Sequence, residues 1–289
     1  MRRVLVLGAS GQLGLKLVRQ LEQVDGLSVV SATRGDTRHP FDLHEPVSLA
    51  DLIDEIRPTM VFHAATGGGV AWCQAHPDES RVVTLDAAGV AAEACLRVRA
   101  KLVFFSTDYV FNGRRARPSE TVLPAPLNVY GRDKLAAEDL ILATSPSNLV
   151  IRTCQLFGRD PKRRNFVYQV VDTISAGRNF AADPHSFGTP TWTSDLARIA
   201  VSLALSDDVG TWHVAGEEYL SRYDLAVTVA NVFGLDATRI VPREARDTTD
   251  GVERPKRAGL TNGRLKNRGW SPMTRLEVAL SRVAALEVV

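Results

Sequence analysis

The sequence is poor in cysteine and has no long apolar run, and both shortages narrow the kind of protein it encodes. Its three cysteines, Cys73, Cys95 and Cys154, are widely spaced and form no CxxC pair. An odd number of isolated cysteines argues against a disulfide framework or a zinc site and fits a reducing compartment. The apolar run near the N-terminus lasts only about five residues, which is too short for a signal peptide or a membrane span. We therefore expect a cytoplasmic protein that does not enter a membrane.

Neither sign of charge is in excess, and the histidines are isolated. The 35 Lys and Arg residues nearly balance the 33 Asp and Glu residues, so the net charge is only +2. Bulk electrostatics therefore give no reason to expect a nucleic-acid partner. His63, His185 and His213 lack the spacing of metal ligands, and we predict no metal site. Short basic runs, such as 254–257, are either solvated loops or contacts for an anionic small ligand such as a diphosphate.

In the first half of the chain, short apolar runs alternate with amphipathic stretches. The apolar runs are β-rich and nearly continuous, as buried parallel strands are. We expect strands over 4–7, 27–30, 60–65, 102–105 and 149–152. The amphipathic stretches predict helices over 12–24, 47–57, 78–98 and 133–143. This alternation predicts an α/β fold, with a Rossmann-type doubly wound parallel sheet and helices on both faces.

Beyond residue 153 the pattern changes, and Pro-rich and Gly-rich punctuation becomes frequent. We expect helices over 165–176, 194–206, 221–233 and 274–286, and short strands near 179–182, 212–214 and 239–241. The pattern predicts a smaller C-terminal α/β lobe at the carboxyl ends of the sheet strands, where such sheets bind their ligands. We therefore divide the chain into domains 1–153 and 154–289, and expect part of 188–215 to return to the first domain.

Three glycines, Gly8, Gly11 and Gly14, follow the first strand directly and open the first helix. The first allows a tight turn, the second lets the backbone approach a pyrophosphate, and the third lets the helix pack closely on the strand. The helix N-terminus adds N–H donors and the positive end of a dipole. This context favours an NAD(P)-binding domain over a purely structural turn. The predicted cofactor contacts in this loop are Gly8, Ser10, Gly11, Gln12, Leu13 and Gly14.

The end of the second strand indicates which dinucleotide binds. An acidic residue there would bind the ribose 2′-hydroxyl, whereas an arginine would accept a 2′-phosphate. Arg34 stands at this point and Asp36 comes slightly late, which favours NADPH and leaves NADH as the alternative. Arg34 could also be a solvated loop residue. Further predicted cofactor contacts are Asp42, Leu43, Ala64 and Ala65.

Three motifs occur in a specific order: FFSTDYVFNG (104–113), LPAPLNVYGRDKLAAED (123–139) and GTPTWTSDLA (188–197). With them the sequence resembles the extended short-chain dehydrogenases/reductases, and more narrowly the dTDP-4-dehydrorhamnose reductase family, over nearly its whole length. The resemblance implies a catalytic trio of Thr107, Tyr130 and Lys134, with Tyr130 and Lys134 also touching the cofactor. The alternative for Tyr130 is a half-buried aromatic residue at the start of a helix.

The chemistry of ketone reduction explains these residue types. The carbonyl oxygen needs a proton, but a free tyrosine, with a pKa of about 10, holds its proton too tightly. Tyr130 and Lys134 are four residues apart and lie on one helix face, so we expect the ammonium to lower the tyrosine pKa. Thr107 would hydrogen-bond the substrate carbonyl and help hold its developing charge.

The positions that would face a sugar depart from the family pattern. Gly67 to Gly69 precede Ala71 in a loop that we expect to be flexible and featureless, and Gln155 replaces a tryptophan. Predicted substrate contacts are Thr107, Asp108, Tyr109, Gln155 and Arg254. The wider set of diphosphate candidates is Arg152, Lys162, Arg163, Arg164, Arg254, Lys256 and Arg257, with Arg254 first.

We expect an NADPH-dependent reductase of a nucleotide-linked 4-keto-6-deoxy sugar, acting in deoxysugar biosynthesis as a monomer or homodimer. Two alternatives stay open, because the motifs for the reaction are intact while the substrate-facing ones are altered. One is a noncatalytic NADP-binding regulatory subunit of the same fold. The other is a short-chain reductase of a non-sugar ketone.

Overall fold

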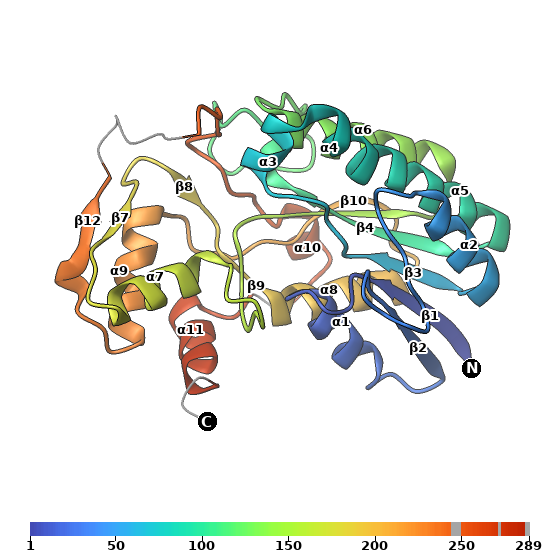
Figure 1. The fold of residues 1–289 in the computed structure, drawn as a ribbon, viewed down its shortest axis with the longest axis horizontal. Helices are drawn as coiled ribbons and strands as arrows, with labels where there is room; N and C mark the ends of the chain where they lie inside the picture. Colours follow the sequence, from blue (N-terminus) through green and yellow to red (C-terminus); the bar gives the residue numbers. More distant parts are fainter. Residues whose placement is uncertain (244–249, 271–272, 287–289) are drawn as a thin grey trace.

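A parallel sheet of six strands forms the centre of the computed structural model, which describes residues 1–243, 250–270 and 273–286 (Figure 1). The strands lie in the order β10-β5-β4-β3-β1-β2, and each neighbouring pair is parallel. Their bounds are β1 Arg2–Leu7, β2 Leu27–Ala32, β3 Met60–His63, β4 Lys101–Thr107, β5 Leu149–Thr153 and β10 Gly210–His213. The order reverses between β1 and β3, so the carboxyl ends of these strands form a crevice. The predicted doubly wound α/β fold is confirmed.

Helices cover both faces of the sheet (Figure 1). Helices α1 (Gly14–Leu21) and α8 (Thr193–Leu205) bury their apolar sides on one face. Helices α2 (Val47–Ile56), α5 (Ala87–Val98) and α6 (Val129–Thr144) cover the other face. Burial on both faces explains why the sheet strands read as nearly continuous apolar runs.

A smaller α/β lobe packs around helices α7 (Phe166–Ser175), α9 (Arg222–Val232) and α11 (Leu276–Ala285) (Figure 1). Three short strand pairs frame it: β7 (Phe180–Ala182) with β12 (Ile240–Pro242), β8 (Phe187–Gly188) with β11 (Leu220–Ser221), and β6 (Leu156–Phe157) with β9 (Thr191–Trp192). Between these elements the chain returns to the sheet as α8 and β10. The division into domains 1–153 and 154–289 stays a prediction.

The remaining short elements fall mostly in loops. They are α3 (Val70–Ala75), α4 (Pro77–Arg81), the π-helical turn η1 (Val82–Asp86), the 3₁₀ turns η2 (Asp108–Val110) and η3 (Ala237–Arg239), and α10 (Gly263–Asn267). The helix predicted over 78–98 is therefore α4, η1 and α5 in succession. Within the described ranges, no helix has the length and apolar character needed to cross a membrane.

The glycine-rich stretch after β3 differs from the flexible, featureless loop that the sequence suggested. It leads into α3, and two of its glycines are sites of close packing. A Cβ on Gly67 would lie 2.2 Å from the Val83 side chain, and one on Gly68 would lie 2.2 Å from the Trp72 ring. These glycines therefore let the loop lie directly against its neighbours, a role that composition alone does not reveal.

Two buried histidines make the stability of the fold dependent on pH. Burial is the main cause that lowers the pKa of His63 to about 4 and of His213 to about 3, from a usual 6.5. Lys134 adds to the effect at His63, and Arg152 adds to it at His213. Below pH 6.5 the unfolded chain therefore binds protons that the folded chain does not, so folding stability falls as the pH falls.

We expect each histidine to cost about 1.4 kcal/mol of stability per pH unit below its unfolded pKa. The free energy of unfolding of the unsubstituted chain should fall between pH 7 and pH 5, and in His213→Phe this fall should be smaller by about 2 kcal/mol. Urea unfolding at the two pH values measures this difference. An unchanged difference would mean that His213 does not stay neutral in the folded chain.

Candidate active site

The glycine loop sits tightly between β2 and β3. The amides of Gly8 and Ala9 donate to the Ala32 carbonyl at 2.9 and 3.2 Å, which fixes the loop to the end of β2. Gly8 has a positive φ of 81°, and a Cβ there would lie 2.7 Å from the Ala65 amide nitrogen. A Cβ on Gly14 would lie 2.1 Å from the Gly8 carbonyl oxygen. Both positions therefore require glycine for close packing.

Gly11 differs from these two glycines because it is exposed and its neighbours are less close. A Cβ there would meet only the Gly8 carbonyl oxygen, at 3.3 Å. The first intrahelical bond runs from the Leu15 amide to the Gly11 carbonyl, so the preceding amides form the open N-terminus of the helix. The first turn of α1 carries no acidic residue in the sequence. Burial lowers the pKa of Lys16 in this turn, and the nearby positive charges of Arg19 and Arg159 lower it further. An open, cationic helix N-terminus fits a dinucleotide pyrophosphate.

Arg34 is exposed just beyond the end of β2. Asp36, the nearby acid, uses its Oδ1 atom to accept the Arg38 amide at 2.8 Å and the His39 amide at 3.4 Å. This carboxylate is engaged in its own turn, while the Arg34 guanidinium extends into solvent. The arrangement suits a 2′-phosphate better than a bare ribose hydroxyl.

Replacement of Arg34 by aspartate should weaken NADPH binding by about 10- to 100-fold, the value of one charge-assisted hydrogen bond. NADH lacks the 2′-phosphate, so its affinity should change far less. Fluorescence titration of both cofactors measures the two dissociation constants. Arg38→Asp, an exposed charge reversal in the same loop, is the matched control. Equal weakening of NADPH and NADH in Arg34→Asp would show that Arg34 does not hold the phosphate.

The other predicted cofactor contacts line the same crevice or lie behind it. Ala64 and Ala65 are half-buried at the end of β3, beside Gly8. The backbone around Asp42 is fixed by the Ser48 hydroxyl, which accepts the Asp42 amide at 3.0 Å. Leu43 is buried in the core under α2. Contact of these four residues with a cofactor stays a prediction.

The predicted trio comes together where β4 ends and α6 begins. The Thr107 hydroxyl accepts the Tyr109 amide at 3.2 Å and lies near enough to Tyr130 to act against the rise of its pKa. The ammonium of Lys134 is buried, donates to the Phe105 carbonyl at 3.0 Å and lies 4.4 Å from the Phe104 ring centre. One strand end and one helix therefore supply all three groups.

Local sequence explains why α6 begins where the trio needs it. The Asn128 side chain caps the helix by accepting the Gly131 amide at 2.9 Å. Its Nδ2 also donates to the Glu253 carbonyl at 2.9 Å. A Cβ on Gly131 would lie 2.3 Å from the Tyr109 carbonyl oxygen, so only glycine lets α6 approach η2 this closely. The helix begins four residues before the predicted 133–143 because of this cap.

Burial dominates the pKa values of the pair. It raises the pKa of Tyr130 above its usual 10, and the Thr107 hydrogen bond only partly opposes this. Burial also lowers the pKa of Lys134 to about 8, against the attraction of Glu138. The expected lowering of the tyrosine pKa is therefore not found among the described residues, because burial outweighs the opposing hydrogen bond.

Asp108 and Tyr109 play different parts beside the trio. The Asp108 carboxylate is buried, accepts the Gly259 amide at 2.9 Å and hydrogen-bonds Cys154. It points into the protein and fixes neighbouring segments, which does not suit the predicted substrate contact through its side chain. Tyr109 packs edge-on against Tyr130, with ring centres 6.2 Å apart, and remains a candidate for substrate contact.

Two of the diphosphate candidates have partners that change how they are interpreted. Arg152 is buried, and its Nε lies 3.0 Å from both carboxylate oxygens of Glu138. It is therefore a structural ion pair and is not available to a diphosphate. Arg254 is about one-third exposed and pairs with Asp250 at 2.8 and 2.5 Å. Burial raises the pKa of Tyr109 and Arg254 partly opposes this, so Arg254 lies near that phenol and stays a candidate.

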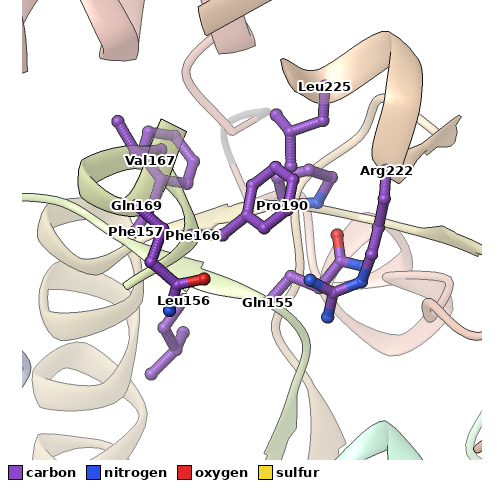
Figure 2. A pocket seen from close by; sticks show the side chains of 9 residues that line it. All are labelled: Gln155, Leu156, Phe157, Phe166, Val167, Gln169, Pro190, Arg222 and Leu225. Atoms are coloured by element: carbon purple, nitrogen blue, oxygen red, sulfur yellow. The ribbon is translucent and has the colours of Figure 1, made fainter. Parts of the chain in front are cut away.

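A cavity of about 220 Å³ lies in the lobe, and its wall includes Gln155, two residues beyond the end of β5 (Figure 2). Its walls combine apolar side chains with the polar groups of Gln155, Gln169 and Arg222 (Figure 2). Gln155 has a positive φ of 44°, and its side chain packs so closely on Gly188 that a Cβ there would lie 2.5 Å from it. The lining residues are Gln155, Leu156, Phe157, Phe166, Val167, Gln169, Pro190, Arg222 and Leu225.

Arg222 is the charged residue of this cavity that the sequence did not single out. It is the first residue of α9, after a capping box in which Ser221 and Asp224 bond each other. Burial raises the pKa of Tyr109, and Arg222 and Arg254 partly oppose this, so both guanidinium groups lie near that phenol. The capping box was the available signal, because it predicts a helix start that would turn the adjacent arginine toward a ligand.

An open glycine loop, a Thr–Tyr–Lys trio and an adjacent lobe cavity define an extended short-chain dehydrogenase/reductase. The family described as RmlD substrate binding domain matches residues 1–288. The dTDP-4-keto-6-deoxy-D-glucose reductase of Streptomyces niveus is 31% identical over 98% of this chain and 97% of its own length. The chain therefore belongs to the RmlD family.

Two further relatives differ in what their names say. The crystal structure of dTDP-4-dehydrorhamnose reductase from Bacillus anthracis, in complex with NADP, is 27% identical. Its TM-score is 0.89, covering 99% of this chain and 100% of that one. Methionine adenosyltransferase 2 subunit beta of Bos taurus is 28% identical over 96% of this chain and 86% of its own length. The family therefore includes proteins named as reductases and proteins named as subunits.

Proposed function

We propose that this chain is an NADPH-dependent reductase of a nucleotide-linked 4-keto-6-deoxy sugar. The observation that carries the proposal is the meeting of Thr107, Tyr130 and Lys134 at the end of β4, between the glycine loop and the lobe cavity. The names of the reductase relatives support the substrate class, and the NADP-bound relative supports the cofactor. The chain is an oxidoreductase that acts on a keto group.

The trio suits proton delivery to the substrate oxygen. Bound NADPH supplies the hydride, with the glycine loop holding its pyrophosphate and Arg34 its 2′-phosphate. Thr107 holds the keto oxygen beside the Tyr130 hydroxyl, from which the proton moves to that oxygen. The raised pKa of Tyr130 keeps this proton in place until the substrate oxygen becomes basic. The buried Lys134 ammonium then stabilises the phenolate that remains.

Arg222, Arg254 and Gln155 suit the rest of the substrate. The guanidinium of Arg222 in the cavity wall and that of Arg254 near Tyr109 match a diphosphate joined to a ring. At about 220 Å³ the cavity holds one ring of such a molecule and leaves the diphosphate at its mouth. The Gln155 carboxamide offers a hydrogen bond where an aromatic ring could offer only stacking.

Turnover of purified dTDP- and UDP-linked 4-keto-6-deoxy sugars, followed by NADPH absorbance, tests the proposal. We expect NADPH oxidation with at least one of these sugars and none with simple ketones of similar size. Activity on simple ketones alone would overturn the sugar assignment and favour a non-sugar short-chain reductase. The cytoplasmic location and the monomeric or homodimeric state remain predictions.

A noncatalytic NADP-binding subunit is the second candidate, because relatives named methionine adenosyltransferase 2 subunit beta match nearly the whole chain. This function predicts cofactor binding without turnover and stoichiometric association with a second chain. NADPH binding with no oxidation across the whole panel of ketones, together with a co-purifying partner, would favour it.

A further inference from the structure

We propose that Asn165 is a positioning residue that couples the glycine loop to the wall of the lobe cavity. Its Nδ2 donates to the Gln12 Oε1 atom at 3.1 Å and to the Gly158 carbonyl at 3.0 Å. Its Oδ1 accepts the Tyr168 amide at 3.3 Å and so caps α7. The side chain is only 8% exposed. One amide group therefore bonds the glycine loop, the preceding loop and α7 at once.

The two ends of this connection lie in the two predicted ligand sites. Gln12 belongs to the open N-terminus of α1, where the cofactor pyrophosphate is expected. Helix α7 begins directly after Asn165, and its first residues, including Phe166, line the cavity. The Arg222 guanidinium lies 5.1 Å from the Phe166 ring centre, so the start of α7 also supports the charged residue of that cavity.

An electrostatic interaction is a second indication that the loop before α7 lies close to the start of α1. Arg159, in the loop before Asn165, acts electrostatically on Lys16 in the first turn of α1. The segment from Gly158 to Asn165 therefore lies against the glycine loop. A cofactor that holds Gln12 in place should also restrict the motion of α7, so that a ligand in the cavity loses less conformational entropy when it binds. A ligand in the cavity should strengthen cofactor binding by the same factor.

This inference rests on the proposed function, because it takes Gln12 as part of the cofactor site. A single hydrogen bond of this kind should make cofactor and cavity ligand strengthen each other by about two- to tenfold. The connection would give Asn165 an influence on both ligands although it need not touch either one.

Matched substitutions separate this connection from simple helix capping. Asn165→Asp keeps a good cap for α7 but replaces the N–H donor to Gln12 with an acceptor. Gln12→Met breaks the same bond from the other side and leaves the α7 cap untouched. Asn165→Ala removes both the bond and the cap. If the connection matters, the first two variants should behave alike.

Hydrogen exchange of the full chain, with and without NADPH, tests the coupling directly. In the unsubstituted chain we expect NADPH to slow amide exchange in 158–171. This slowing should be lost in Asn165→Asp and in Gln12→Met at NADPH concentrations that saturate each variant. Titration with dTDP, a probe for the cavity side, should show about two- to tenfold tighter binding with NADP⁺ present, and only in the unsubstituted chain.

The outcomes separate this inference from the proposed function. Equal slowing of exchange in the unsubstituted chain and both variants, or no slowing at all with NADPH bound, would overturn the coupling and leave the reductase proposal standing. Failure of dTDP to bind while the exchange effect remains would count against the nucleotide-sugar substrate and leave the coupling supported. Failure of NADPH itself to bind would overturn both.

Discussion

Tyr130→Phe should lower kcat by about a hundred- to ten-thousand-fold while NADPH binding stays nearly unchanged. Phenylalanine keeps the ring that packs edge-on against Tyr109 but has no proton to give to the keto oxygen. Turnover of a keto-sugar, followed by NADPH absorbance, gives kcat, and fluorescence titration gives the dissociation constant of NADPH. Loss of turnover with intact cofactor binding would assign the role to the hydroxyl and exclude a collapsed site.

The same change at Tyr223 provides the control for this experiment. Tyr223 lies in α9, and its ring packs against the lobe core, so the loss of its hydroxyl should leave kcat unchanged. Full activity in Tyr130→Phe would contradict the assignment of the proton donor. It would leave the cofactor site unaffected, because that site is tested separately by Arg34→Asp.

Arg152→Met should destabilise the fold by about 3–5 kcal/mol, because it leaves the Glu138 carboxylate buried without its partner. The guanidinium and the carboxylate are 5% and 1% exposed and join β5 to the catalytic helix α6. Replacing both partners, in Arg152→Met with Glu138→Leu, should recover much of the lost stability, since no uncompensated charge remains. Denaturant unfolding of the two variants measures these free energies.

An exposed ion pair gives the comparison for the buried one. Arg97 and Asp54 lie 2.6 Å apart but are 50% and 44% exposed. Arg97→Met should therefore cost no more than about 1 kcal/mol. The Arg152 guanidinium also lies 5.2 Å from the Phe111 ring centre. If the single and double substitutions at Arg152 and Glu138 were equally unstable, the loss would come from this ring contact and not from an unpaired buried charge.

The sheet could be predicted from the sequence because the patterns that indicate it involve residues close together along the chain. Buried parallel strands appear as continuous apolar runs, and the spacing of Gly8, Gly11 and Gly14 follows from the turn that they build. Tyr130 and Lys134 could be placed on one face for the same reason, since helical spacing relates positions that are close along the chain.

The features that the sequence did not reveal depend on contacts between distant segments. Arg152 seemed to be an anion-binding residue until the structure placed Glu138 against it. Asp108 seemed to face the substrate, but the Gly259 amide draws it inwards. For Arg222, the capping box of Ser221 and Asp224 indicates the helix start, but the side-chain contact with the cavity follows only from the fold. Such roles follow from tertiary contacts, which one sequence without its fold does not specify.

The return of α8 and β10 to the sheet has a consequence for any attempt to divide or recombine this protein. Residues 193–213 supply an edge strand and a helix that covers α1, although they follow α7 of the lobe along the chain. A fragment that stops at residue 153 would leave β5 as an unpaired edge and expose the apolar part of the sheet face that α8 covers. Exchange of lobes between relatives should therefore keep 193–213 with the N-terminal half, which requires three junctions, near residues 153, 192 and 213.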